Sequence, residues 1–264
     1  MDERNGVHYE MRPDHPPGVI CIASGELARY PHFTHSMLNV LRPKGTQIHM
    51  GIGLNVAANF NSGVRQMMAT PGMEWVWIMG DDHEFDPTTL LRLLDHELDI
   101  VVPLVVRRQP PFIPVLFKQP KNDTPLGQFP PFYWHELPTG GLLGPSDGLY
   151  TCGSAGMLIR RSVLDVLADP WFEMGKMGKD LTNEDTHFCM KVQEAGFSIY
   201  ADLDTTLDHW TPISLRPVQT DSGVWTVALN LGGNIQVQLP PSLLTELVRT
   251  VKEETKENFG LITS

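Results

Sequence analysis

Short apolar runs alternate with segments of helical periodicity along the first hundred residues. The run that ends at Met79 is apolar on both faces, as is typical of a central strand in a parallel sheet. The alternation predicts an α/β fold, with a mostly parallel sheet covered by helices on both faces. The predicted strands are residues 19–24, 46–53, 73–79 and 99–106, and the predicted helices are residues 34–41, 55–68 and 88–98.

Two of these helices carry recognisable start signals. Thr34 suits the N-cap of the first helix, because a threonine side-chain oxygen can accept from the free amides of the first turn. Asp86 suits the N-cap of the third helix, and Pro87 suits its first helical position.

The alternation stops between Arg107 and Gly148, where Pro, Gly and aromatic residues are frequent. One short strand at 113–117 is predicted within a loop that is longer than compact domains usually contain without a functional reason. We expect residues 119–148 to act as a lid that orders when a ligand binds. Its aromatic residues suit either a platform on which a sugar stacks or a small core beneath the loop. They are Phe129, Phe132, Tyr133 and Trp134.

Regular structure resumes after Gly148 and changes character near the end of the chain. A strand and a helix are predicted within 149–169, followed by a helix that ends at Gly196 and one more strand. Alternating residues around a Gly-Gly-Asn turn predict a hairpin at 223–240, and a terminal helix follows at 242–258.

These changes divide the chain into three parts. Residues 1–17 are expected to be a tail, residues 18–210 the α/β domain, and residues 211–264 a C-terminal extension of hairpin and helix. The extension is a candidate interface of a homo-oligomer and equally a candidate cover for an acceptor.

Composition narrows the functional classes. The 264 residues are 41% hydrophobic, enough for a sizeable core, and the net charge of −11 argues against broad binding to nucleic acid or anionic membranes. No apolar run approaches the roughly 18 residues of a membrane span, and the polar, acidic start is unlike a secretory signal. The three cysteines form no C-x-x-C motif and are expected to be reduced thiols of a cytoplasmic protein.

The sequence "IMGDDHEFDP" at 78–87 carries the first candidate chemistry. It places Asp81 and Asp82 directly after a predicted buried strand, where like charges repel unless a counter-charge is present. Ligands of open α/β sheets bind beyond the carboxyl ends of the strands, and Mg²⁺ or Mn²⁺ prefers carboxylate oxygens. The alternative is that these residues cap the next helix, but Asp86 already serves that role.

A second candidate group opens the helix in "TNEDTHFCMKVQEAGF". Asp185 precedes Phe188 and Val192 at i+3 and i+7, so it lies on the core-facing stripe at the helix N-terminus. The helix dipole is expected to keep this carboxylate ionised, as a general base requires. An ordinary capping group of Thr182, Glu184 and Asp185 explains the pattern equally well.

His209 follows the last predicted strand of the domain, in "DHW". A single histidine is usually structural, but this one can reach the sheet edge that carries Asp82. Histidine together with carboxylates suits Mn²⁺ somewhat better than Mg²⁺.

Taken together, these segments resemble the GT-A glycosyltransferases of the broad family-2 type. Four stretches match in order between Val19 and Trp210: "CIAS", "WVWIMGDDHEFDPTTLLRLL", "CGSAGMLIRRSVL" and "NEDTHFCMKVQEAGFSIYADLDTTLDHW". They resemble the strand that holds the nucleotide base, the D-x-D strand, the strand beside the acceptor, and the helix with the catalytic base. Each motif is weak alone, but the ordered set is fairly specific.

The resemblance implies a role for each matched position. Asp82 is expected to bind the metal ion, Mn²⁺ or Mg²⁺, with His209 completing its shell and Asp81 beside it, near the metal or the ribose. Asp185 is expected to be the catalytic base, with Glu184 next to it. The expected donor-binding residues are Ala23, Ser24, Asn59, Asp81, Arg107 and Arg108, and the expected acceptor and sugar pocket is formed by Gly153, Ser154, Ala155 and Trp134.

One position departs from the family. Gly80 stands where the family often has an acidic residue, so the working pair is either Asp81 with His83 or Asp82 with Glu84. For the paired arginines, a solvated strand edge is as good an explanation as contact with phosphates.

The expected function is metal-dependent transfer of a sugar from a UDP- or GDP-sugar to an acceptor hydroxyl, with inversion. One alternative is a nucleotidyltransferase or hydrolase on a similar sheet, although "CIASGELARY" is a poor phosphate loop. The other is a non-catalytic module that binds sugar nucleotides. The acceptor is not indicated by any motif.

Overall fold

The computed structural model describes residues 15–25, 30–53, 55–109, 111–120, 129–177, 180–231, 236–243, 245–246 and 249. Contacts between residues divide the chain into two units, each described separately below. One contains Met1–Arg108 and Phe112–Trp210, and the other contains Gln109–Pro111 and Thr211–Ser264.

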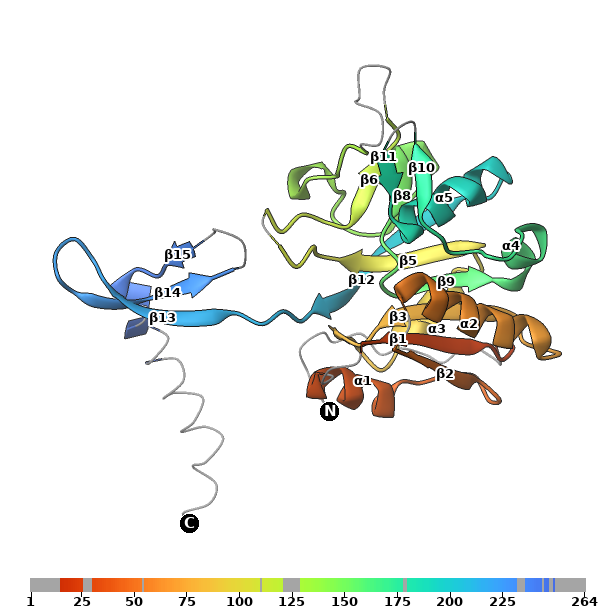
Figure 1. Ribbon diagram of the computed structural model, residues 1–264, viewed down its shortest axis with the longest axis horizontal. Helices are drawn as coiled ribbons and strands as arrows, with labels where there is room; N and C mark the ends of the chain where they lie inside the picture. Colours follow the sequence, from red (N-terminus) through yellow and green to blue (C-terminus); the bar gives the residue numbers. More distant parts are fainter. Residues whose placement is uncertain are drawn as a thin grey trace, which may run out of the picture. The chain divides into compact units, whose positions relative to one another are not determined.

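An eight-stranded mixed sheet is the centre of the larger unit (Figure 1). Its order is β2-β1-β3-β9-β5-β12-β4, with β7 paired to β12. The strands β2, β1, β3, β5 and β12 run in one direction, and β9, β4 and β7 run against them. The bounds are β1 (Val19–Ser24), β2 (Gln47–Ile52), β3 (Trp75–Gly80), β4 (His83–Glu84), β5 (Ile100–Val105), β7 (Leu142–Leu143), β9 (Met157–Arg160) and β12 (Ile199–His209).

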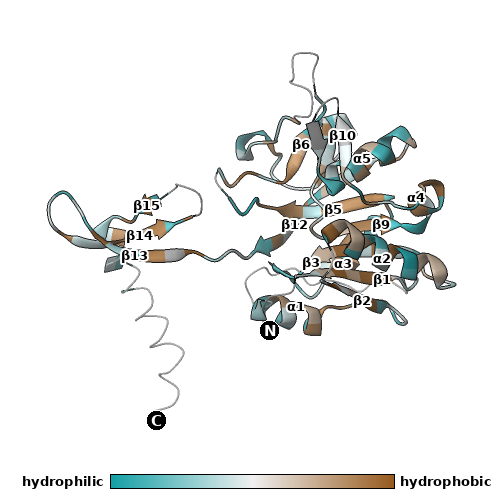
Figure 2. Cartoon of the chain, in the orientation of Figure 1, coloured by the Kyte–Doolittle hydropathy of each residue, from teal (hydrophilic) through white to brown (hydrophobic). Residues whose placement is uncertain are grey.

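Helices cover both faces of this sheet, as the apolar pattern predicts. Phe60, Val64 and Met67 of α2 pack on one face, together with apolar residues of α4 and α5. Residues of α1 and α3 pack on the other face around Trp75 and Trp77. The central strand β5 is drawn mostly brown in Figure 2, as expected for a strand between two apolar layers. The helices are α1 (Pro31–Asn39), α2 (Val56–Ala69), α3 (Thr89–Asp95), α4 (Arg161–Val166) and α5 (Glu184–Glu194).

The pairing registers bring distant segments to one edge of the sheet. Ala23 of β1 pairs with Gly80 of β3, so the residues that follow both strands emerge together. Met157 pairs with Ile78, which brings the turn before β9 to the same edge because β9 runs antiparallel. His209 pairs with His83 across β12 and β4.

Several predicted boundaries are wrong, each for a local reason. The first helix begins at Pro31 and not after Thr34, because Pro has the φ that suits the first turn. The third helix begins at Thr89, and Asp86 instead accepts hydrogen bonds from the backbone and hydroxyl of Thr88 at 2.8 and 2.5 Å.

The strand predicted after Gly148 is in fact two strands. β8 (Leu149–Cys152) pairs with β6 (Leu116–Lys118), and β9 inserts between β3 and β5. The turn between them contains Gly156 at φ +71°, a conformation that favours glycine. The remaining short elements of this unit are β10 (Gly175–Met177), β11 (Asp180–Thr182) and the 3₁₀ turns η2 (Trp134–Glu136) and η3 (Pro145–Asp147).

The end of the predicted tail is anchored on the larger unit. The Pro16 carbonyl accepts from Trp75 Nε1 at 2.7 Å, and His15 lies 2.8 Å from Asp95. Residues 1–14 lie outside the described residues.

The smaller unit contains a three-stranded antiparallel sheet. β14 (Trp225–Asn230) and β15 (Gln236–Gln238) confirm two strands of the predicted hairpin, while its Gly-Gly-Asn turn lies outside the described residues. β13 (Ser214–Gln219) was not predicted, and it contains Pro217, which a sheet tolerates at an edge strand such as this one. Of the predicted terminal helix, residues 242, 243, 245, 246 and 249 are described, and they are helical.

Among the described residues, no helix is both long enough and apolar enough to cross a membrane.

Candidate active site

A pocket of about 390 Å³ lies at the carboxyl ends of β1 and β3. The pocket is also lined by small residues of the turn before β9, by the first turn of α5, and by the last residue of β12. It contains most of the residues singled out from the sequence. These are Ala23, Ser24, Asn59, Asp81, Asp82, Arg108, Gly153, Ser154, Ala155, Asp185 and His209.

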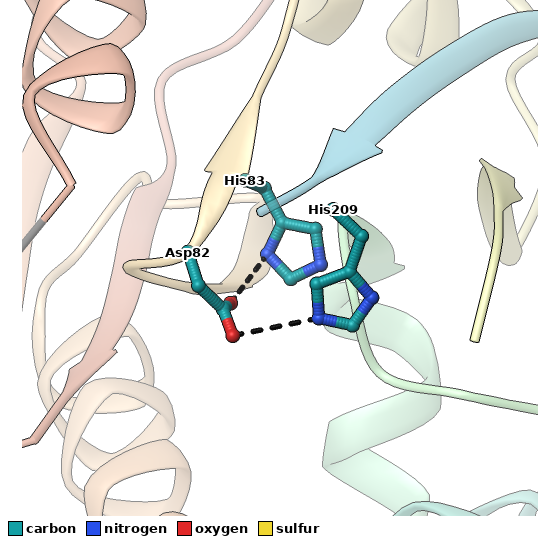
Figure 3. A group of neighbouring side chains, drawn as sticks. All are labelled: Asp82, His83 and His209. Carbon is teal, nitrogen blue, oxygen red and sulfur yellow. Dashed lines mark ion pairs between the residues drawn. The ribbon is translucent and has the colours of Figure 1, made fainter. Parts of the chain in front are cut away.

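One wall of the pocket carries a group of potential metal ligands, Asp82, His83 and His209, whose ligand atoms all lie within 4.8 Å of one another (Figure 3). Asp82 lies in the turn between β3 and β4, and the two histidines face each other across the β4–β12 pairing. Their rings stack with centroids 4.3 Å apart. Short antiparallel pairing thus fixes both imidazoles beside one carboxylate.

The neutral form of His209 has one possible tautomer. Its Nδ1 lies 2.9 Å from the carbonyl oxygen of Val106, which can only accept, so Nδ1 carries the proton. Nε2 then has a free lone pair and faces Asp82 Oδ2 at 3.4 Å. Two electron-rich atoms in this arrangement are stabilised by a cation between them, as in metal sites where a backbone carbonyl orients the histidine.

His83 supplies a second observation that fits a metal ion. Its side chain is 3% exposed, and neither ring nitrogen has a hydrogen-bond partner among the described residues. Nδ1 approaches Asp82 Oδ1 to 3.0 Å, but as an ion pair by distance and not with hydrogen-bond geometry. A buried imidazole without partners is costly, and coordination of a cation would remove that cost.

The Asp82 carboxylate is stabilised in its ionised form. Burial acts to raise the pKa of Asp82, but hydrogen bonds and positive charge from the protonated forms of His209 and His83 outweigh this effect and hold the pKa well below its usual range. Oδ2 also accepts a hydrogen bond from Arg108 Nη1 at 2.7 Å. Asp82 is therefore ionised at neutral pH, as a metal ligand would need to be.

Asp81 points to a different part of the pocket. Its Oδ2 accepts a hydrogen bond from the Ser24 hydroxyl at 2.6 Å, which joins the ends of β3 and β1. Asp81 is absent from the ligand group found among the described residues, whereas His83 belongs to it. The structure therefore pairs Asp82 with His83, and neither of the two pairs expected from the sequence forms the group.

Glu84, the other expected partner of Asp82, is engaged elsewhere. Its Oε2 accepts from Trp210 Nε1 at 3.0 Å and lies 3.5 Å from His32.

Gly80 has a steric reason to replace the acidic residue expected there. A Cβ atom at this position would lie 2.8 Å from Asp82 Oδ1, too close for any side chain unless the carboxylate moved. The observed orientation of the Asp82 side chain therefore depends on a glycine at position 80.

Asp185 lies on another wall of the pocket, in the first turn of α5. Burial raises its pKa to about 6, while hydrogen bonds from Thr186 act against this and the charge of Glu184 adds to it. The helix dipole was expected to keep this carboxylate ionised, but desolvation has the larger effect and raises the pKa. The carboxyl is nevertheless mostly ionised at pH 7, and its pKa suits a general base.

Glu184 and Asp185 face different cavities. Glu184 lines a second cavity of about 600 Å³ together with the start of α2 and residues Phe172, Glu173 and Met174. Consecutive residues on a helix point about 100° apart, which separates the two carboxylates. The structure does not bring Glu184 into the pocket that holds Asp185.

Gly153 lies close to Asp185 and to Val115, the residue before β6. A Cβ atom there would approach a methyl carbon of Val115 to 2.7 Å and Asp185 Oδ2 to 3.8 Å. Asn59 closes the pocket from α2 and is 2% exposed, so it is an inward-facing residue and not a helix-surface one.

Besides Glu184, two expected site residues do not line the pocket. Arg107 is exposed beside Arg108, and Trp134 is about half exposed with its Nε1 donating to the Phe112 carbonyl. Of the other loop aromatics, Phe132 belongs to the main core, Phe129 stacks on Tyr150, and Tyr133 is exposed. Residues 121–128 of the predicted lid lie outside the described residues.

From the sequence, His83 is expected only as a partner of Asp81. His83 and Phe85 are both buried, and Glu84 between them is partly exposed, as in a strand with one buried face. A two-residue strand is too short to recognise from periodicity alone.

Comparisons with known proteins give a likeness in fold. No family model matches the chain, and no curated protein matches it. Among solved structures, it is similar to the crystal structure of A197 from STIV, with a TM-score of 0.51 and 11% sequence identity over 84% of this chain and 98% of that chain. At this identity the likeness supports the mixed α/β fold and nothing more specific.

Proposed function

We propose that this chain is a metal-dependent glycosyltransferase of the GT-A type, which transfers a sugar from a UDP- or GDP-sugar to an acceptor hydroxyl with inversion. The observation that carries the proposal is that two walls of one pocket carry different chemical groups. One wall has the cation-ligand group of Asp82, His83 and His209, and another has the isolated Asp185 carboxyl with a pKa of about 6. Displacement of a nucleoside diphosphate by a hydroxyl requires a cation that neutralises the leaving group and a base that accepts the hydroxyl proton.

Asp82, His83 and His209 would hold Mn²⁺ or Mg²⁺, which supplies charge neutralisation for the departing diphosphate. Two imidazoles among three ligands favour Mn²⁺ over Mg²⁺, which prefers oxygen ligands. Ser24 and Asp81, joined at the ends of β1 and β3, provide polar groups for the nucleoside.

The transfer itself is assigned to Asp185. The acceptor oxygen attacks the anomeric carbon, its proton passes to the Asp185 carboxylate, and the bond from that carbon to the diphosphate oxygen breaks. Attack opposite the leaving group inverts the anomeric configuration. The absence of a side chain at Gly153 allows Val115 to pack against the backbone beside this carboxylate.

The test is to incubate the protein with UDP- and GDP-sugars and Mn²⁺ and to identify the broken bond by ³¹P NMR. The proposal predicts release of the nucleoside diphosphate, slowly to water and faster with a suitable hydroxyl acceptor. Release of a nucleoside monophosphate would instead favour a nucleotidyltransferase or phosphohydrolase. Binding without turnover across acceptors would favour the non-catalytic module.

A further inference from the structure

The Asp82 oxygen that faces His209 already has a positively charged partner. Oδ2 lies 3.4 Å from His209 Nε2 and accepts from Arg108 Nη1 at 2.7 Å. A cation shared by Asp82 and His209 would bind this same oxygen. A guanidinium and a divalent ion at one carboxylate oxygen repel each other, so the two compete for Asp82.

Arg108 is the more exposed member of its ion pair with Asp82. Its side chain is 49% exposed, whereas that of Asp82 is 18% exposed, so the arginine can move and the carboxylate is held in place. Arg108 follows the end of β5 and lines the pocket. Arginine is also well suited to a diphosphate, because its fork of N–H groups matches phosphate oxygens.

We propose that Arg108 and the divalent cation exchange at Asp82, and that the displaced guanidinium then binds the diphosphate of the donor. Arg108 is thus a positioning residue that couples metal binding to donor binding, and the inference rests on the proposed function. The exchange predicts opposite effects of removing the guanidinium: tighter metal binding without nucleotide, and weaker nucleotide binding with metal.

The chain contains a matched control. Arg107 has the same charge one residue earlier, is exposed, and does not line the pocket. Arg107→Gln and Arg108→Gln change the net charge equally, so a general electrostatic effect on metal affinity would be similar in both variants.

The first measurement is a titration of the full chain with Mn²⁺ alone, followed by electron paramagnetic resonance of the free ion. We expect Arg108→Gln to bind Mn²⁺ about tenfold more tightly than the unaltered protein, since it loses a competing charge-assisted hydrogen bond. Arg107→Gln should change the affinity by less than about twofold. Equal effects of the two substitutions, unchanged or weaker Mn²⁺ binding in Arg108→Gln, or no Mn²⁺ binding to any of the proteins would overturn the exchange.

The second measurement is calorimetric titration with UDP and with GDP at saturating Mn²⁺. Arg108→Gln should weaken nucleotide binding about tenfold, Arg108→Lys should restore part of the affinity, and Arg107→Gln should leave it unchanged. Undiminished binding to Arg108→Gln would overturn the second half of the exchange. If the unaltered protein binds neither nucleotide, the proposed function fails, and the Mn²⁺ titrations still decide the competition at Asp82.

Discussion

At the scale of single residues, burial raises the pKa of the Asp185 carboxyl, and this pKa affects the role of proposed catalytic base. Asp185→Asn keeps the shape and removes the basic oxygen. Transfer should fall by roughly 10²–10⁴-fold, while Mn²⁺ and nucleotide affinity should stay nearly unchanged. Because the pKa is raised to about 6, the rate should rise with pH through about 6 and level off above it. Steady-state rates between pH 5 and 8 test this, and a near-normal rate for the variant would mean that Asp185 is only a helix cap.

The same pKa has a consequence for stability that needs no substrate. A carboxyl whose pKa is higher in the folded than in the unfolded state stabilises the fold fully below its unfolded value, 3.8, and this contribution is lost as pH rises through about 6. Asparagine does not ionise, so Asp185→Asn should be more stable at pH 8, by up to about 3 kcal/mol, and should lose the advantage near pH 4. Urea unfolding at the two pH values measures it. A difference independent of pH would contradict the raised pKa.

Single substitutions can distinguish the proposed metal ligands from their neighbours. His83→Gln and Asp82→Asn should each weaken binding of Mn²⁺ alone by tenfold or more, since each removes a ligand and its orienting contacts. Asp81→Asn should leave that binding within about twofold, because Asp81 is tied to Ser24. Electron paramagnetic resonance titrations decide the assignment. A large loss in Asp81→Asn with none in His83→Gln would restore the pair of aspartates expected from the sequence.

At the scale of elements, the strands β1, β3 and β5 could be predicted because each is a short continuous apolar run, and helix α2 because its apolar residues have helical spacing. The position of Asp82 at the ligand-binding edge of the sheet could also be predicted, because ligands of parallel sheets bind beyond the carboxyl ends of the strands. The antiparallel insertion of β9 could not be predicted, since its apolar run, Met157–Ile159, carries no information on strand direction. The place of His83 depends on the pairing of β4 with β12, which is a long-range contact and leaves no local pattern.

The turn between β8 and β9 gives a prediction at this scale. Gly153→Ala should crowd Val115, whose methyl carbon would lie 2.7 Å from the new Cβ, and should push β6 or the turn out of place. We expect a loss of about 1–3 kcal/mol in stability, together with weaker sugar-nucleotide binding. Val115→Ala in the same chain should relieve both effects, because it removes the atom in contact. A double-mutant cycle by thermal unfolding and calorimetry measures the coupling, and additive effects would show that the two positions do not meet.

At the scale of the whole molecule, all residues that line the pocket belong to the larger unit. The smaller unit presents exposed apolar side chains, including Leu215 and Trp225, on its own three-stranded sheet. If the metal and donor sites depend on the larger unit alone, a chain that ends at Trp210 should fold, bind Mn²⁺ and bind UDP or GDP with affinities within about twofold of the full chain. Transfer to the acceptor is the step that the smaller unit is free to influence. Calorimetry on the shortened chain measures binding, and circular dichroism verifies that it is folded. A folded shortened chain that no longer binds Mn²⁺ would show that the second unit supports the ligand group, and the division of function between the units would then be wrong.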